Sequence, residues 1–98
     1  MVIVGGEFDV DPLQREAFIE GRHDGMRRSR AEEGCLEYTM SADPLDPGRV
    51  LLYERWASQE ALDAHLSAMA PAAPSETAIA PLAASIIIYT VSGERRLV

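Results

Sequence analysis

Two alternating stretches joined by a short turn occupy the middle of the chain, and this hairpin restricts the possible folds more than any other feature. In residues 35–42 and again in residues 49–57, every second side chain is largely apolar, which is the pattern of half-buried strands. The segment between them, Asp43-Pro44-Leu45-Asp46-Pro47-Gly48, is made of residues that favour tight turns. One face of the first strand carries Leu36, Tyr38 and Met40, and one face of the second carries Val50, Leu52, Glu54 and Trp56.

Further strands and helices are predicted on both sides of the hairpin. Residues 2–10 alternate as a strand, and Asp11-Pro12-Leu13-Gln14 is typical of a helix start, so we expect a helix from there to about Glu33 that ends at Gly34. Ser58 caps a second helix, whose apolar stripe is Leu62, His65, Leu66 and Met69. We also expect a short helix opened by Ser75 and limited by Pro81. Three isoleucines predict that a last strand, residues 86–91, is buried on both faces.

The order strand, helix, strand, strand, helix, strand predicts an α+β fold of the ferredoxin-like, split βαβ type. In this fold two helices cover one face of a four-stranded antiparallel sheet. The chain has 98 residues, so we expect one domain over residues 1–98. The other face of the sheet carries apolar residues that no helix covers, and a homodimer through this face is the simplest cover.

Charge and cysteine content exclude several classes of partner. The formal net charge is −7, which argues against nucleic acid and anionic membranes, because both require a basic patch. Acidic residues follow the first few apolar positions too closely for a signal peptide, and no run reaches the roughly 20 apolar residues of a membrane span. The single cysteine, Cys35, cannot form an internal disulfide. We therefore expect a soluble protein of the reducing cytoplasm.

Four blocks of sequence resemble one known family. They are Glu33-Gly34-Cys35-Leu36-x-Tyr38, Asp43-Pro44, Tyr53-Glu54-x-Trp56, and Ala61-Leu62-x-Ala64-His65-Leu66. In order and spacing they are similar to the antibiotic biosynthesis monooxygenase (ABM) family, whose superfamily includes the quinol monooxygenases. The resemblance implies a dimeric α/β barrel, in which two protomers pack sheet to sheet and each C-terminal segment crosses to its partner. It also implies a pocket between sheet and helices, where a phenol, quinol or anthrone reacts with O2 without metal or flavin.

The resemblance points to three catalytic candidates: His65, Glu54 and Trp56. Trp56 matches a tryptophan that lines the pocket in some members, and the alternative is a ring of the core. Glu54 matches a glutamate two residues earlier. It either accepts a phenol proton or has a structural role, in which it pairs with a cation such as Arg22 or Arg55 or caps backbone groups, and we favour the structural role. His65 lies on the apolar stripe, either as a base or as a structural histidine.

The remaining candidates are expected to bind an aromatic substrate as walls or polar contacts of the pocket. They are Phe8, Arg22, Tyr38, Leu52, Leu62, Leu66 and Met69. Two isolated histidines without a carboxylate cluster at ligand spacing are a poor metal site, so neither metal nor another cofactor is expected.

Two positions depart from characterised relatives and keep other functions open. Members that oxidise polyketides carry an asparagine four residues before the tryptophan, where this chain has Leu52. Many quinol monooxygenase-like members carry a histidine at the position of Ala70. Cofactor-independent oxidation of a small phenol, quinol or polyketide-like compound is our first hypothesis. The alternatives are a non-redox cyclase or isomerase, and a protein that binds a small hydrophobic ligand without turnover.

Overall fold

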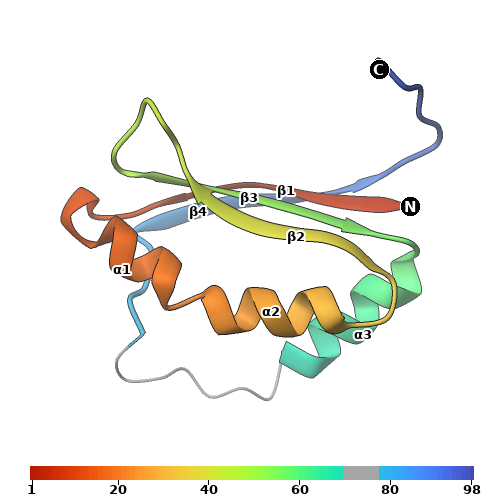
Figure 1. The fold of residues 1–98 in the computed structure, drawn as a ribbon, viewed down its shortest axis with the longest axis horizontal. Coiled ribbons are helices and arrows are strands. Elements are labelled where there is room, and N and C mark those ends of the chain that lie inside the picture. The colour runs from red at the N-terminus through yellow and green to blue at the C-terminus, as the bar shows by residue number, and fades with distance from the viewer. Residues whose placement is uncertain (70–77) are drawn as a thin grey trace.

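The structure, a computed structural model, describes residues 1–69 and 78–98 (Figure 1). Its elements in chain order are β1 (Val2–Asp9), the 3-10 turn η1 (Pro12–Gln14), α1 (Arg15–Glu20), α2 (His23–Ala31), β2 (Cys35–Ala42), β3 (Arg49–Trp56), α3 (Gln59–Met69) and β4 (Ala83–Thr90). The short helix expected to begin at Ser75 falls on the segment 70–77, outside the described residues, as does Ala70.

The four strands form one antiparallel sheet in the order β2-β3-β1-β4. In Figure 1, α1, α2 and α3 lie on the same side of this sheet. This arrangement confirms the ferredoxin-like prediction. Between the helices and the sheet lies a core of buried apolar side chains: Val2, Val4, Phe8, Val10, Phe18, Met26, Tyr38, Met40, Val50, Leu52, Trp56 and Leu62.

The first helical region is broken, whereas the sequence predicted one continuous helix to about Glu33. The backbone N–H of Arg22 donates to the carbonyl of Ile19, three residues back, at 3.0 Å, and the regular ladder resumes only in α2. Glycine at position 21 weakens the helix at this point, because its backbone loses more freedom on folding than that of any other residue. The predicted start is confirmed, since the Asp11 carboxylate accepts from the N–H of Leu13 at 2.9 Å.

The predicted burial of the last strand on both faces is wrong for the chain by itself. Ile86, Ile87 and Ile88 are 44%, 49% and 50% exposed. The strand lies at the edge of the sheet, paired only with β1. Three consecutive isoleucines are a signal of burial, but they do not show what provides it.

One residue of the predicted hairpin face also turns away from the core. A register irregularity between Cys35 and Glu37 interrupts the pairing of β2 with β3. As a result Leu36 is 47% exposed, whereas Tyr38 and Met40 are buried as predicted. A bulge of this kind reverses the alternation of side chains at that point.

Gly34 joins α2 to β2 and packs closely against α3. It has a φ of +82°, and a Cβ atom there would lie 2.5 Å from the Cβ of Ala61 on α3. We therefore expect Gly34→Ala to destabilise the protein by about 2 kcal/mol or more, since it adds a steric clash to a left-handed backbone that alanine disfavours. Thermal unfolding followed by circular dichroism should show a midpoint lower by roughly 8 °C or more.

Gly93→Ala is the matched control, because a Cβ atom there meets nothing within 4 Å. Equal midpoints for the two variants would contradict the claim that Gly34 constrains the fold.

Candidate active site

A pocket of about 390 Å³ opens between β2 and the helices, and we call it the helix–sheet pocket. Its floor comes from Tyr38 and Met40 on β2, and α3 contributes His65 and Met69. The other lining residues are Gly21, Arg22, Asp24, Gly25, Met26, Arg28, Ser29, Glu32 and Ala68. The volume suits a small organic ligand.

Beneath this pocket, Trp56 and Glu54 form a buried polar pair on the inner face of β3. Trp56 is 0% exposed and Glu54 is 5% exposed. The indole Nε1–H of Trp56 donates to Oε1 of Glu54 at 2.9 Å. Two positions apart on one strand, the side chains share a face, which allows this contact. The sequence favoured a structural role for Glu54, with Arg22 or Arg55 as candidate partners; among the described residues its hydrogen-bond partner is this indole.

The Glu54 carboxyl is held in an environment that favours its neutral form. Burial raises its pKa above the ordinary value, and the charge of Glu32 adds to this effect. The hydrogen bond from Trp56 and the proximity of His65 act in the opposite direction without cancelling it.

His65 is oriented by a carboxylate on another helix. Its Nδ1 lies 2.9 Å from Oε2 of Glu32, the residue that ends α2. The ring is 2% exposed and lies 4.7 Å, centroid to centroid, from Trp56 and 5.5 Å from Tyr38. An ionised carboxylate only accepts hydrogen bonds, so Nδ1 carries a hydrogen in this contact, and in the neutral ring Nε2 is the nitrogen with the lone pair.

His65 lines the helix–sheet pocket from α3. Within residues 1–69 and 78–98, the fully buried side-chain nitrogens without a partner are the Nε atoms of Arg49 and Arg55, and Nε2 of His65 is not among them. It also has no hydrogen bond to a described protein atom, while the residue lines the pocket. A neutral imidazole with its acceptor nitrogen open to a cavity and its other nitrogen held by a carboxylate has the arrangement of a general base.

Tyr38 lies on the pocket floor with its hydroxyl kept protonated. Burial, followed by the charge of Glu54, raises the pKa of Tyr38 to about 12, although Arg22 and Ser29 oppose the shift. At neutral pH the phenol is therefore a hydrogen-bond donor for an oxygen of a bound ligand.

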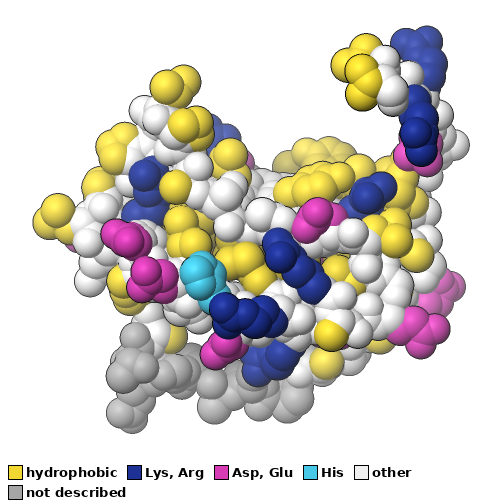
Figure 2. Space-filling model, in the orientation of Figure 1, with side chains coloured by type: hydrophobic (Ala, Val, Ile, Leu, Met, Phe, Trp, Pro, Cys, Tyr) yellow, Lys and Arg dark blue, Asp and Glu magenta, His cyan; other side chains and the backbone are white. Residues whose placement is uncertain are grey.

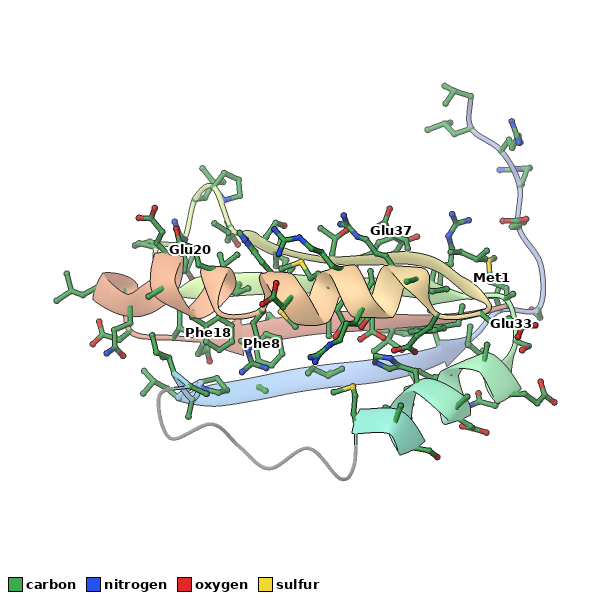
Figure 3. The ribbon with its side chains drawn as sticks, turned by 60° about the horizontal axis from the view of Figure 1, so that its bottom comes forward. Met1, Phe8, Phe18, Glu20, Glu33 and Glu37 are labelled. Atoms are coloured by element: carbon green, nitrogen blue, oxygen red, sulfur yellow. The ribbon has the colours of Figure 1, made fainter. Side chains whose placement is uncertain are left out.

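The other predicted site residues divide between the pocket and the core. Arg22, Tyr38, His65 and Met69 line the pocket, whereas Leu52 and Leu62 are buried in the core. Phe8 packs against Phe18 with ring centroids 5.5 Å apart, and Figure 3 shows the two rings side by side. Leu66 is 46% exposed on α3. Roles for these residues in substrate binding stay predictions.

Sequence reasoning missed Glu32, although it holds the candidate base. Glu32 and His65 are 33 positions apart, and only the packing of α2 beside α3 brings them together. The position of Glu32 near the end of a predicted helix was the one available signal. That position does not indicate which side chain Glu32 contacts. Ser29 was missed for a related reason, since the extent of the pocket was not known.

Metal binding has no visible basis in the part of the chain that the structure describes. No group of three or more His, Cys, Asp or Glu side chains there is arranged to hold an ion. The polar groups around the pocket are instead suited to hydrogen bonding and proton transfer.

Comparison with known proteins identifies the family. The sequence model of the antibiotic biosynthesis monooxygenase family matches residues 1–72. The chain belongs to this family. An uncharacterised protein of Synechocystis sp. is 33% identical over 64 residues, which is 65% of this chain and 44% of that protein. The chain thus matches less than half the length of this curated relative.

Solved structures agree with the ABM fold. Rv0793 from Mycobacterium tuberculosis has a TM-score of 0.72 and 25% identity, over 97% of this chain and 98% of that chain. A proposed antibiotic biosynthesis monooxygenase from Deinococcus radiodurans has a TM-score of 0.72 and 19% identity, over 100% of this chain and 99% of that chain.

Among the described helices, none has the length and apolar character needed to cross a bilayer.

The buried pair predicts opposite effects for two substitutions of Glu54. Glu54→Gln keeps an acceptor for the indole and removes the buried charge, so it should be more stable than the wild type at neutral pH. Because the pKa of Glu54 is raised in the folded protein, the protonated carboxyl does not destabilise the wild type at pH values below the ordinary pKa of 4.5. The wild type loses stability as the pH rises through the pKa of the folded state. The difference in the free energy of unfolding between Glu54→Gln and the wild type should therefore shrink at acidic pH. Urea unfolding at several pH values measures this difference.

Glu54→Leu leaves the indole N–H without an acceptor and should be less stable than Glu54→Gln by roughly 1–3 kcal/mol. The exposed Glu33→Gln is the control for loss of one charge. If the difference in the free energy of unfolding between the wild type and Glu54→Gln does not change with pH, burial of the Glu54 charge is not its cause.

Proposed function

We propose that this ABM protein oxidises a small phenol or quinol with O2 and uses no cofactor. The observation that carries the proposal is the Glu32–His65 pair, which leaves Nε2 of His65 open to the helix–sheet pocket. Characterised members of the family to which the chain belongs supply the reaction type.

His65 acts on the substrate hydroxyl in this scheme. Nε2 takes the phenol proton, and the resulting imidazolium is paired with the Glu32 carboxylate at 2.9 Å. The proton transfer leaves the total charge of the site unchanged, because the Glu32–His65 pair loses its net negative charge as the substrate gains one. The protonated Tyr38 hydroxyl can donate a hydrogen bond to the phenolate oxygen.

The substrate itself supplies every electron that the reaction needs. A phenolate transfers one electron to O2, and recombination of the two radicals forms a carbon–oxygen bond to a ring carbon that bears hydrogen. Loss of that hydrogen and cleavage of the O–O bond release water and leave a quinone carbonyl. One O2 thus becomes one carbonyl oxygen and one water, and the substrate undergoes a four-electron oxidation without a separate reductant. The protein's tasks are binding, orientation and proton transfer.

The proposed base predicts a specific loss of oxygen consumption. We expect purified protein to consume O2 with a panel of quinols, dihydroxynaphthalenes and anthrones faster than autoxidation, and His65→Ala to lower kcat/KM by about 100-fold or more. A Clark electrode without added cofactor measures this. His23→Ala is the matched control, because His23 is the second histidine and is exposed on α2.

Three outcomes separate the hypotheses. Uptake that falls in His65→Ala but not in His23→Ala supports the proposal. Product formed from such a compound without O2 would favour a cyclase or isomerase. Saturable quenching of Trp56 fluorescence without any product would favour a binding protein and contradict turnover.

We propose further that the protein is a homodimer joined through the outer face of the sheet, the face away from the helices. This outer face includes Ile3, Leu51, Tyr53, Ile87 and Tyr89. Tyr53, Ile87 and Tyr89 are about half exposed, and Figure 2 shows hydrophobic side chains along this side of the sheet. The C-terminal segment extends away from the body on the same side, which supports its crossing to a partner (Figure 1).

A charge on the outer face should break this dimer. Ile87→Arg places an unpaired cation in the proposed interface and should raise the dissociation constant at least about 100-fold. Light scattering during size exclusion should then give the mass of one chain, against two for the wild type. Leu13→Arg is the control, since Leu13 is 95% exposed on η1. Two chains for Ile87→Arg would contradict the interface, and deletion of residues 94–98 tests the crossing segment.

We also assign the protein to the cytoplasm. The thiol of Cys35 is free, as in a reducing compartment.

A further inference from the structure

Arg22 differs from four other arginines of the chain in having no hydrogen-bond or ion-pair partner among the described residues. Arg15 and Arg30 donate to backbone carbonyls, while Arg27 and Arg49 contact carboxylates. Among the described residues Arg22 makes no hydrogen bond and no ion pair, although it is half-buried and lines the helix–sheet pocket. A guanidinium has five N–H donors, so an Arg22 without partners in a pocket can bind an acceptor there.

The guanidinium of Arg22 is nevertheless held in place. Its central carbon lies 4.6 Å from the centroid of the Phe18 ring, and Phe18 is 1% exposed and packed against Phe8 (Figure 3). A guanidinium stacked on an immobile ring keeps its in-plane N–H groups available at the edge. Arg22 also starts α2, beside the break that follows α1, so its backbone is part of the pocket rim.

The carboxylates around the pocket already have partners. Glu32 accepts from His65, and Asp24 is paired with Arg27 at 2.7 Å. The second lining arginine, Arg28, adds positive charge at the same helix. The pocket lining thus has two distinct parts. Arg22 and Arg28 form a cationic part, and α3 contributes His65 to the other.

We propose that the substrate is an aromatic hydroxy acid, whose carboxylate is bound by Arg22 while its hydroxyl faces His65. A planar carboxylate matches the paired N–H groups of a guanidinium, which bind it through two parallel hydrogen bonds. A ring between the two groups would lie over Tyr38 and Met40 on the pocket floor. This inference rests on the proposed function and specifies the substrate class of the same site.

Matched acids and esters test this inference. Under anaerobic conditions we would titrate the protein with gentisate and with a dihydroxynaphthoate, each beside its methyl ester, by calorimetry and by fluorescence of Trp56, the only tryptophan. We expect at least one acid to bind about tenfold or more tightly than its ester. Arg22→Gln should abolish this preference, and Arg22→Lys should restore part of it.

Arg96→Gln is the control for the loss of one positive charge, because Arg96 is exposed and lies outside the pocket lining. The acid-to-ester ratio of the wild type decides the substrate class even if Arg22→Gln fails to fold. Equal binding of acid and ester, or tighter binding of the ester, would overturn the inference and leave the proposed oxidation of neutral quinols intact. A preference that survives in Arg22→Gln would overturn the assignment to Arg22.

If neither acid nor ester binds, while neutral quinols still support O2 uptake, the carboxylate requirement is wrong. If uptake is absent as well, the proposed function fails with it.

Discussion

Complete burial of the Trp56 indole is the constraint on which the rest of the site depends. A buried N–H needs an acceptor, and Glu54 provides one from the same face of β3 at 2.9 Å. The acceptor brings a carboxylate into the core, where burial raises its pKa. The indole also forms the surface on which the His65 ring packs. One aromatic residue thus determines the placement of both titratable groups nearest the sheet, and Glu32 then selects which nitrogen of His65 is left for chemistry.

Much of the fold could be predicted because its signals are local. Alternation along the strands, the Pro- and Gly-containing turn, and the caps at Asp11 and Ser58 each depend on neighbouring residues only, and both caps are present in the structure. The break near Gly21 could not be placed, since a glycine inside a helix is often tolerated. The exposure of β4 was also unpredictable, because hydrophobicity indicates that a strand is covered without indicating by what.

The site was predictable to the extent that its residues share a face of one element. Glu54 and Trp56 follow from strand alternation, and His65 follows from the stripe of α3. Contacts between elements were not accessible in this way. Arg22 was considered as a partner for Glu54, yet the guanidinium stacks on Phe18, one helical turn earlier in the chain, at 4.6 Å. Glu32, 33 positions from His65, shows the same limit more strongly.

The departure at Leu52 has a structural meaning. Where polyketide-oxidising relatives carry an asparagine on the strand, Leu52 is buried opposite Met40 and Gly6 and does not line the pocket as described. The polar groups that face the pocket come mainly from the helices, from Arg22, Ser29 and His65, with Tyr38 as the contribution of the sheet. Polar contacts to a bound ligand would therefore come mainly from the helical side of the pocket. Since Arg22 and Glu32 directly flank α2, the length of this one helix sets the separation between Arg22 and the carboxylate that contacts His65.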